Sequence, residues 1–207
     1  MKNKAQTNLR SLRSKHGASL IMVMIVLTIV SMLGIAGIQI SLMGERGARN
    51  DRDMQLAWQS AEAALIDAQN DIAGPATSTR RAIFAGKQLF NFVDGCGTSG
   101  NNRGLCMMVN SGRPTWLRPG FDFSATGANA PSASYGEFTG RSFASGTVGV
   151  QPAQAPRYVI EIMDDYGNTD LGADAPKKKY LYRVTAIGFG PRTDIQAVIQ
   201  MIYRDNN

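Results

Sequence analysis

The side chains best suited to catalysis are scarce in this 207-residue sequence. The single histidine, His16, lies in a basic leader ahead of a long apolar run. If this leader is removed, no Ser-His-Asp or Cys-His arrangement and no histidine-containing zinc site can be assembled. We therefore expect no enzymatic activity and no cofactor, and the remaining candidates for chemistry are thiols and carboxylates.

The thiols are those of Cys96 and Cys106, the two cysteines, which flank the glycine-rich segment CGTSGNNRGLC. Disulfides persist in exported proteins, so export of this region would favour a Cys96–Cys106 bond that restrains the loop. Two free thiols that never meet are the alternative. A metal site is disfavoured, because two thiolates supply only half of a tetrahedral shell.

The carboxylates cluster in the segment MDDYGNTDLGAD, residues 163–174. Oxygen ligands for calcium could come from Asp164, Asp165, Asn168, Asp170 and Asp174. Turns between strands are rich in Asp, Asn and Gly for conformational reasons, so a plain loop is the favoured interpretation. We expect no bound metal, with calcium at this segment as a weak alternative.

A stronger signal lies where the leader meets the apolar run. The leader contains five basic and no acidic residues, and the 28 residues from Gly17 to Gly44 contain no Asp, Glu, Lys or Arg. A membrane-spanning helix needs about 20 such residues, and the flanking positive charge predicts a cytoplasmic N-terminus with the C-terminal bulk exported. Without the leader 17 basic residues face 16 acidic ones, so the sequence does not predict nucleic-acid binding.

Three interpretations fit this junction. A secretory signal peptide needs a shorter apolar core and a cut on its far side. An uncleaved single-pass anchor, carrying a periplasmic binding module or enzyme, is the second interpretation. The third is a cut between Gly17 and Ala18, which removes residues 1–17 and keeps the apolar run.

One long helix is predicted from about Ala18 to about Ile72, with an apolar half (18–44) and an amphipathic half (45–74) that starts with charged residues. If continuous, it would measure roughly 80 Å at about 1.5 Å per residue. Gly74-Pro75 is expected to end it. One apolar stripe of the upper half is predicted to pack against the rest of the domain. Its members are Met54, Trp58, Ala61, Leu65, Ala68 and Ile72.

The rest of the chain divides into a variable region and a strand-rich region. Residues 75–156 are rich in glycine and proline, which favours loops and short elements. Residues 157–207 contain three segments rich in β-branched and aromatic residues, at 157–163, 179–189 and 194–204, which predict antiparallel strands. We therefore expect an α+β fold in which a small antiparallel C-terminal sheet covers the apolar stripe, and in which 45–74 and 75–207 form one periplasmic domain.

Three stretches resemble the PilX family of type IV pilus minor pilins. They are GASLIMVMIVLTIVSMLGIAGIQ, ERGARNDRDMQLAWQSAEAALIDAQ and YRVTAIGFGPRTDIQAVIQMIYR. The resemblance implies the type IV pilin fold and a class III signal peptide, in which the prepilin peptidase cuts between Gly17 and Ala18 and methylates the new amine of Ala18. It also places Met22 where major pilins carry a glutamate. In the filament core this carboxylate would form an ion pair with the N-terminal amine of a neighbouring subunit. A subunit that lacks the carboxylate cannot form this pair, so we expect it at a filament end.

By the same resemblance, the protein is expected to prime pilus assembly within a tip complex, after residing in the bacterial inner membrane with its C-terminal domain in the periplasm. The implied partners are other minor pilins, the major pilin, the prepilin peptidase, the inner-membrane assembly platform, a tip adhesin-like protein and, before assembly, the lipid bilayer. A K-type minor pseudopilin of type II secretion is the alternative within the class. Its larger helical insertion is not suggested by the glycine-rich region.

Overall fold

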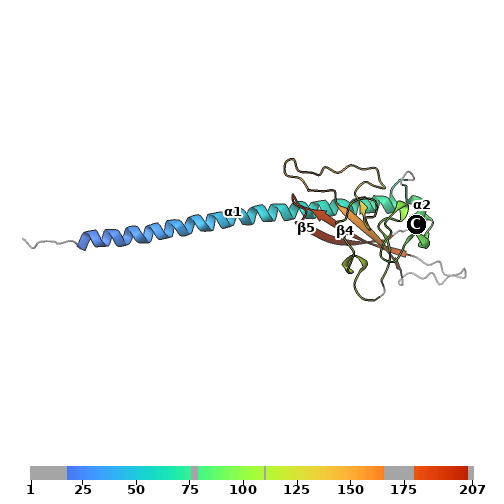
Figure 1. Ribbon diagram of the computed structural model, residues 1–207, viewed down its shortest axis with the longest axis horizontal. Coiled ribbons are helices and arrows are strands. Elements are labelled where there is room, and N and C mark those ends of the chain that lie inside the picture. Colours follow the sequence, from blue (N-terminus) through green and yellow to red (C-terminus); the bar gives the residue numbers. More distant parts are fainter. Residues whose placement is uncertain (1–17, 76–78, 110, 166–179, 205–207) are drawn as a thin grey trace, which may run out of the picture. The chain divides into compact units, whose positions relative to one another are not determined.

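The computed structural model describes residues 18–75, 79–109, 111–165 and 180–204 (Figure 1). The chain divides into two compact units, one up to Arg49 and one from Asn50 onward. The boundary lies within the helix α1 (Ala18–Ala73). The predicted helix is confirmed to within one residue, and the N–H of Gly74 closes its last turn by donating to the carbonyl of Asn70 at 2.8 Å.

The second unit contains one mixed sheet. Its strands are β1 (Leu105–Met107), β2 (Ala133–Ser134), β3 (Arg157–Asp164), β4 (Tyr180–Phe189) and β5 (Gln196–Arg204). The order is β1-β3-β4-β5, and β2 also pairs with β3. The three predicted C-terminal strands are antiparallel, as expected, whereas β1 pairs with β3 in parallel. The sequence did not indicate this pairing, because β1 is only three residues long and carries no alternating pattern.

The variable region consists of short elements and turns. They are α2 (Arg81–Ala85) and the 3-10 turns η1 (Leu89–Asn91), η2 (Gly100–Asn102) and η3 (Thr115–Leu117). Residues 88–94 contain η1 and one isolated parallel bridge, between Val93 and Cys106. Lys87 and Gly95, on either side of this segment, have positive φ, which interrupts an extended backbone.

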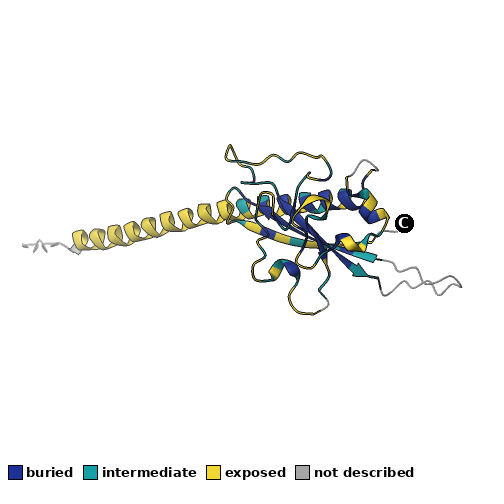
Figure 2. Ribbon diagram, turned by 45° about the vertical axis from the view of Figure 1, so that its right-hand side comes forward, coloured by how far each residue is buried: buried dark blue, intermediate teal, exposed yellow. Residues whose placement is uncertain are grey.

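Side chains are buried on both faces of the sheet. One face carries Tyr158, Ile160, Tyr182 and Val184, which form a core with the alanines of α1. The other face carries Val159, Ile187 and Phe189, which pack with the disulfide and with Phe123 of the variable region. The sheet is therefore covered by α1 on one face and in part by loops on the other (Figure 2).

Candidate functional site

The first unit offers a helix whose apolar side chains are all exposed. Residues 19–49 of α1 are exposed throughout, Met22 among them at 70% (Figure 2). Among the described residues, α1 is the one helix long and apolar enough to cross a membrane. The hydroxyl of Thr28 donates to the carbonyl of Met24 at 2.8 Å, so this polar group is satisfied within the helix. Such a helix needs an apolar environment, either lipid or other helices.

Charged residues appear on α1 only from Glu45 onward, after the apolar segment. Arg49 pairs with Glu45 one helical turn earlier, at 2.5 Å. In the second unit, Arg52 pairs with its neighbour Asp53 at 3.0 Å. The side chains of Arg49, Glu45 and Arg52 are more than half exposed, and exposed ion pairs contribute about 0–1 kcal/mol each. These residues therefore mark where α1 becomes polar, but their ion pairs contribute little to stability.

The second unit packs α1 against the sheet through small residues. Four alanines and one isoleucine are almost fully buried on this face of the helix: Ala57, Ala61, Ala64, Ala68 and Ile72. Opposite them on β4, Gly188 lies so close that a Cβ there would overlap the backbone of Ala57 and Ala61. The backbone of the strand is thus in direct contact with the backbone of the helix. This contact requires glycine on the strand and small residues, here alanine, on the helix.

The predicted packing stripe needs a partial correction. Ala61, Ala68 and Ile72 are buried and Leu65 is half-buried, but Met54 and Trp58 are 43% and 51% exposed. The buried row begins instead at Ala57, because large side chains cannot enter a contact of this closeness. The indole N–H of Trp58 donates to the exposed Glu62 at 2.9 Å.

A buried polar network ties α1 to the loops that follow it. Arg80 has no exposed side-chain surface and forms an ion pair with Asp71, which its Nε reaches at 3.1 Å. The hydroxyl of Tyr158 donates to the same carboxylate at 3.0 Å, and Nη1 of Arg80 donates to the carbonyl of Arg103 at 2.6 Å. The guanidinium lies 3.6 Å from the ring centroid of Phe138. The sequence carried no signal for this network, since nothing local distinguishes Arg80 from Arg81.

The network explains the direction of two pKa shifts. Burial lowers the pKa of Arg80, but the charge of Asp71 and the contact with Tyr158 more than offset this, so the pKa is raised. Burial, reinforced by the Asp71 carboxylate, raises the pKa of Tyr158 well above its usual value. Arg80 therefore stays charged and Tyr158 stays neutral, which keeps the hydrogen bonds between them and Asp71 intact.

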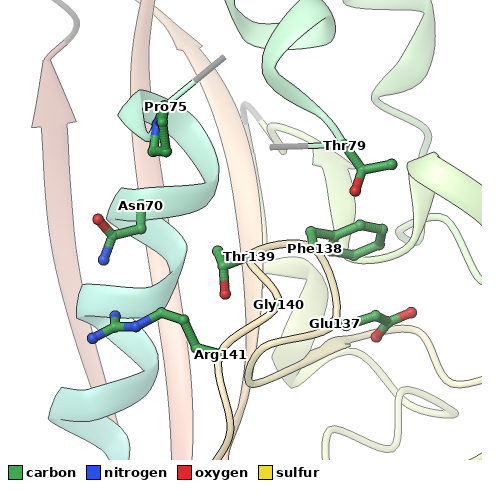
Figure 3. Close-up of a pocket in the computed structure, with 8 residues that line it drawn as sticks. All are labelled: Asn70, Pro75, Thr79, Glu137, Phe138, Thr139, Gly140 and Arg141. Carbon is green, nitrogen blue, oxygen red and sulfur yellow. The ribbon is translucent and has the colours of Figure 1, made fainter. Parts of the chain in front are cut away.

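Asp67, one turn before Asp71, anchors a second loop to α1. Its buried carboxylate accepts the N–H of Gly136 at 2.7 Å and the hydroxyl of Thr139 at 2.5 Å, and Arg141 lies 4.0 Å away. Burial raises the pKa of Asp67, and these contacts oppose it. The same loop, with Asn70, Pro75 and Thr79, lines an open cavity of about 670 Å³ (Figure 3). The cavity holds no group of three potential metal ligands in the part of the chain that the structure describes.

The disulfide is present. Cys96 and Cys106 are bonded and almost fully buried, and Cys106 lies on β1 opposite Glu161 of β3. Cys96 has a positive φ of 70°, which a side chain seldom adopts. The bond therefore fastens a turn of the variable region directly to the sheet.

The calcium candidate gains no support. Asp164 ends β3, and the carboxylate of Asp165 is 4% exposed and pairs with Arg204 at 3.2 Å. Asn168, Asp170 and Asp174 lie outside the described residues. In the described part of the chain, no three His, Cys, Asp or Glu side chains gather as a metal site.

The cleavage site can be placed only in part. Ala18 begins α1, whereas Gly17 lies outside the described residues. Cleavage at Gly17-Ala18 and methylation of Ala18 thus remain predictions, as does the role assigned to Met22.

A long apolar helix whose upper half packs on a small sheet is the type IV pilin fold. A family model described as the C-terminal part of the type IV pilus assembly protein PilX matches residues 102–205, about half of the chain, and a PilX N-terminal model matches residues 16–65. The chain belongs to the PilX family of type IV pilus assembly proteins. This family is structural, and its membership supports the role of a minor pilin. No curated protein and no solved structure matches the chain significantly.

Proposed function

We propose that this minor pilin primes assembly of a type IV pilus and resides in a complex at the tip of the filament. The observation that carries the proposal is the uncharged helix segment, which is exposed along its whole length and has methionine at residue 22. By the resemblance to pilins, this is the position of the usual glutamate. The first acidic residue of α1 is Glu45. A helix of this kind packs well in an apolar bundle but offers no carboxylate to the N-terminal amine of a neighbour.

The proposed path begins with cleavage between Gly17 and Ala18 by the prepilin peptidase and methylation of Ala18. The mature chain then waits in the inner membrane with its sheet domain in the periplasm. Extraction exposes the apolar half of α1, and helices of other minor pilins and of the major pilin cover it. Burial of this surface against other helices offsets the cost of taking it out of lipid, because apolar area left in water would cost about 25 cal/mol per Å².

Processing is tested by Gly17→Val, with the same substitution at Gly34 as a control inside the helix. Gly17→Val should block loss of the 17-residue leader, whereas Gly34→Val, which has open space around it, should be cleaved normally. The measurement is the mass of the chain from cells that contain the prepilin peptidase. Normal cleavage of Gly17→Val, or an uncleaved wild type, would overturn this step.

Priming is tested by deleting the gene and counting surface pili. The deletion should remove most pili while the major pilin stays in the membrane, and normal pilus numbers would contradict the proposal.

Tip placement is tested by Met22→Glu, with Met24→Glu as the matched control on the same exposed segment. Wild type should be found at the ends of sheared filaments by immunogold labelling, and Met22→Glu should also label the shaft. Wild type distributed along the shaft would refute the tip location. Identification of the neighbouring subunits by crosslinking would also distinguish a pilus from a secretion pseudopilus.

A further inference from the structure

The two edges of the sheet differ in whether their backbone groups are already bonded. At one edge lies β1, where the N–H of Met107 donates to the carbonyl of Val93 at 2.9 Å and the N–H of Gly97 donates to the carbonyl of Leu105 at 3.1 Å. At the other edge lies β5, which pairs with β4 alone among the described strands. In the described part of the chain, one edge is therefore capped and the other is open.

Alternate residues of β5 direct their backbone groups to this open edge. The N–H of Gly190 donates to the carbonyl of Ile195 at 2.8 Å, and this pair continues the β4–β5 register. In an antiparallel ladder, hydrogen-bonded pairs alternate with pairs that exchange no backbone hydrogen bond. The residues of β5 whose N–H and C=O point away from β4 are therefore Gln196, Val198, Gln200, Ile202 and Arg204.

β5 lacks the features that usually protect an edge strand. It is nine residues long, and its register with β4 is uninterrupted from Gln196 to Arg204. Residues 196–203 contain no proline and no charged residue. Natural edge strands are commonly short or bulged, or carry lysine or proline, because a regular apolar edge pairs with other strands. The regular edge of β5 is therefore explained by a strand that pairs with it in an assembly.

Apolar side chains extend along both faces of β5. On the face away from α1, Val198 is 40% exposed and Ile202 is 64% exposed. On the face toward α1, three side chains are only half-buried against the core: Ile199, Met201 and Tyr203. A strand added beside β5 would cover both sets, because its own side chains alternate between the two faces. The strand that fits this edge is uncharged and carries apolar side chains.

A second copy of this chain does not fit the open edge. The β1 edge of such a copy is capped by Val93 and Gly97, so β5 could pair only with the β5 of the copy. A symmetric pair of β5 strands is antiparallel, and it reverses the direction of α1 from one copy to the other. Two copies inserted in one membrane with the same topology have their helices in the same direction. The strand that pairs with β5 therefore belongs to a different chain.

We propose that β5 accepts an extended, uncharged strand of a different pilus subunit, which adds to the sheet at its open edge. In strand addition, backbone hydrogen bonds supply affinity and alternate side chains supply specificity. The contacts of Val198 and Ile202 then select the partner strand. The inference rests on the proposed function only in taking pilus subunits as the neighbours of this chain, and it does not depend on priming or on the tip location.

The first test is amide hydrogen exchange of the full chain alone in detergent micelles, followed by NMR. The N–H groups of Val198, Gln200 and Ile202 should exchange rapidly, whereas those of Ile199 and Met201, which are bonded to β4, should exchange slowly. This measurement needs no other subunit, so it tests the open edge independently of the proposed function. Protection of the three outward amides in the isolated chain would overturn the proposal, because the edge would already be covered.

The second test places a photocrosslinking amino acid at residue 202 in cells that assemble pili, with the product identified by mass spectrometry. The expected product joins residue 202 to an extended segment of a different pilus subunit. A product between two copies of this chain, a product with a protein outside the pilus, or no product would overturn the proposal.

Val198→Pro removes one outward N–H and leaves the hydrogen bonds between β4 and β5 in place, since proline is tolerated where the N–H of an edge strand faces outward. It should lower the crosslinking yield about tenfold, the effect of one lost hydrogen bond. Val198→Lys keeps the N–H but adds a charge to the exposed face; it should also lower the yield, and it decides the outcome if the proline variant is unstable. Val148→Pro, at a valine of the variable region that is 81% exposed, is the control and should crosslink as wild type does. Yields from both Val198 variants equal to wild type would refute strand addition.

Discussion

Replacing Gly188 with alanine should separate the sheet from α1. A Cβ at this position would overlap the backbone of Ala57 and Ala61 and would lie 2.8 Å from Cα of Ala61, where ordinary contacts are 3.4–4 Å. Backbone atoms cannot rotate away as a side chain can, so the helix must move. Overpacking of a core costs about 1–3 kcal/mol, and we expect about 3 kcal/mol here because the obstacle is backbone. That corresponds to a fall in melting temperature of roughly 6–12 °C for a domain of this size.

The assay is denaturant unfolding of the full chain in micelles, followed by near-ultraviolet circular dichroism of the sheet domain. Gly47→Ala is the control, because a Cβ added at Gly47, on the exposed part of the helix, would meet no atom within 4 Å. Alanine there should raise helix propensity by about 1 kcal/mol and leave the sheet domain unchanged. Ala61→Gly should fail to rescue Gly188→Ala, since the overlap is with backbone atoms that remain. An unfolding free energy of Gly188→Ala within about 0.5 kcal/mol of wild type, the range of a neutral surface change, would refute the packing argument.

Three further predictions concern the groups that hold the loops to the core. Arg80→Met should lower the free energy of unfolding by about 3–5 kcal/mol, because it leaves the buried Asp71 carboxylate without its cation, and adding Asp71→Leu should recover part of this loss in a double-mutant cycle. Cys96→Ser with Cys106→Ser should cost about 2–4 kcal/mol by chemical denaturation, and an equal stability of oxidised and reduced wild type would contradict it. Burial raises the pKa of Asp67, so its carboxyl binds a proton more tightly in the folded state and favours folding as pH falls through that pKa. Asp67→Asn should remove this rise in a pH series of melting temperatures, with stability at neutral pH equal to or above that of wild type.

Much of the fold could be predicted from local patterns. The helix from Ala18 and the three C-terminal strands follow from apolar periodicity and from β-branched and aromatic residues, which act over a few positions. Family membership followed from stretches at the two ends of the chain, where the PilX models also match. The disulfide between the two cysteines was expected if this region is exported, and the bond is present.

The buried face of α1 could be predicted only in part. The spacing of Met54 and Trp58 fits the apolar stripe, yet both are exposed and alanines take the contact. The glycine within YRVTAIGF was the available signal, because glycine inside a strand often marks a close backbone approach. It sets how near the strand comes, and therefore which helix residues are small enough to be buried.

The sequence by itself determined an uncharged membrane-length segment and a helix followed by strands, because each is a property of neighbouring residues. Tertiary structure decided which charges were buried and paired. Asp71 and Tyr158 are 87 positions apart and meet only because β3 packs on α1 beside Arg80.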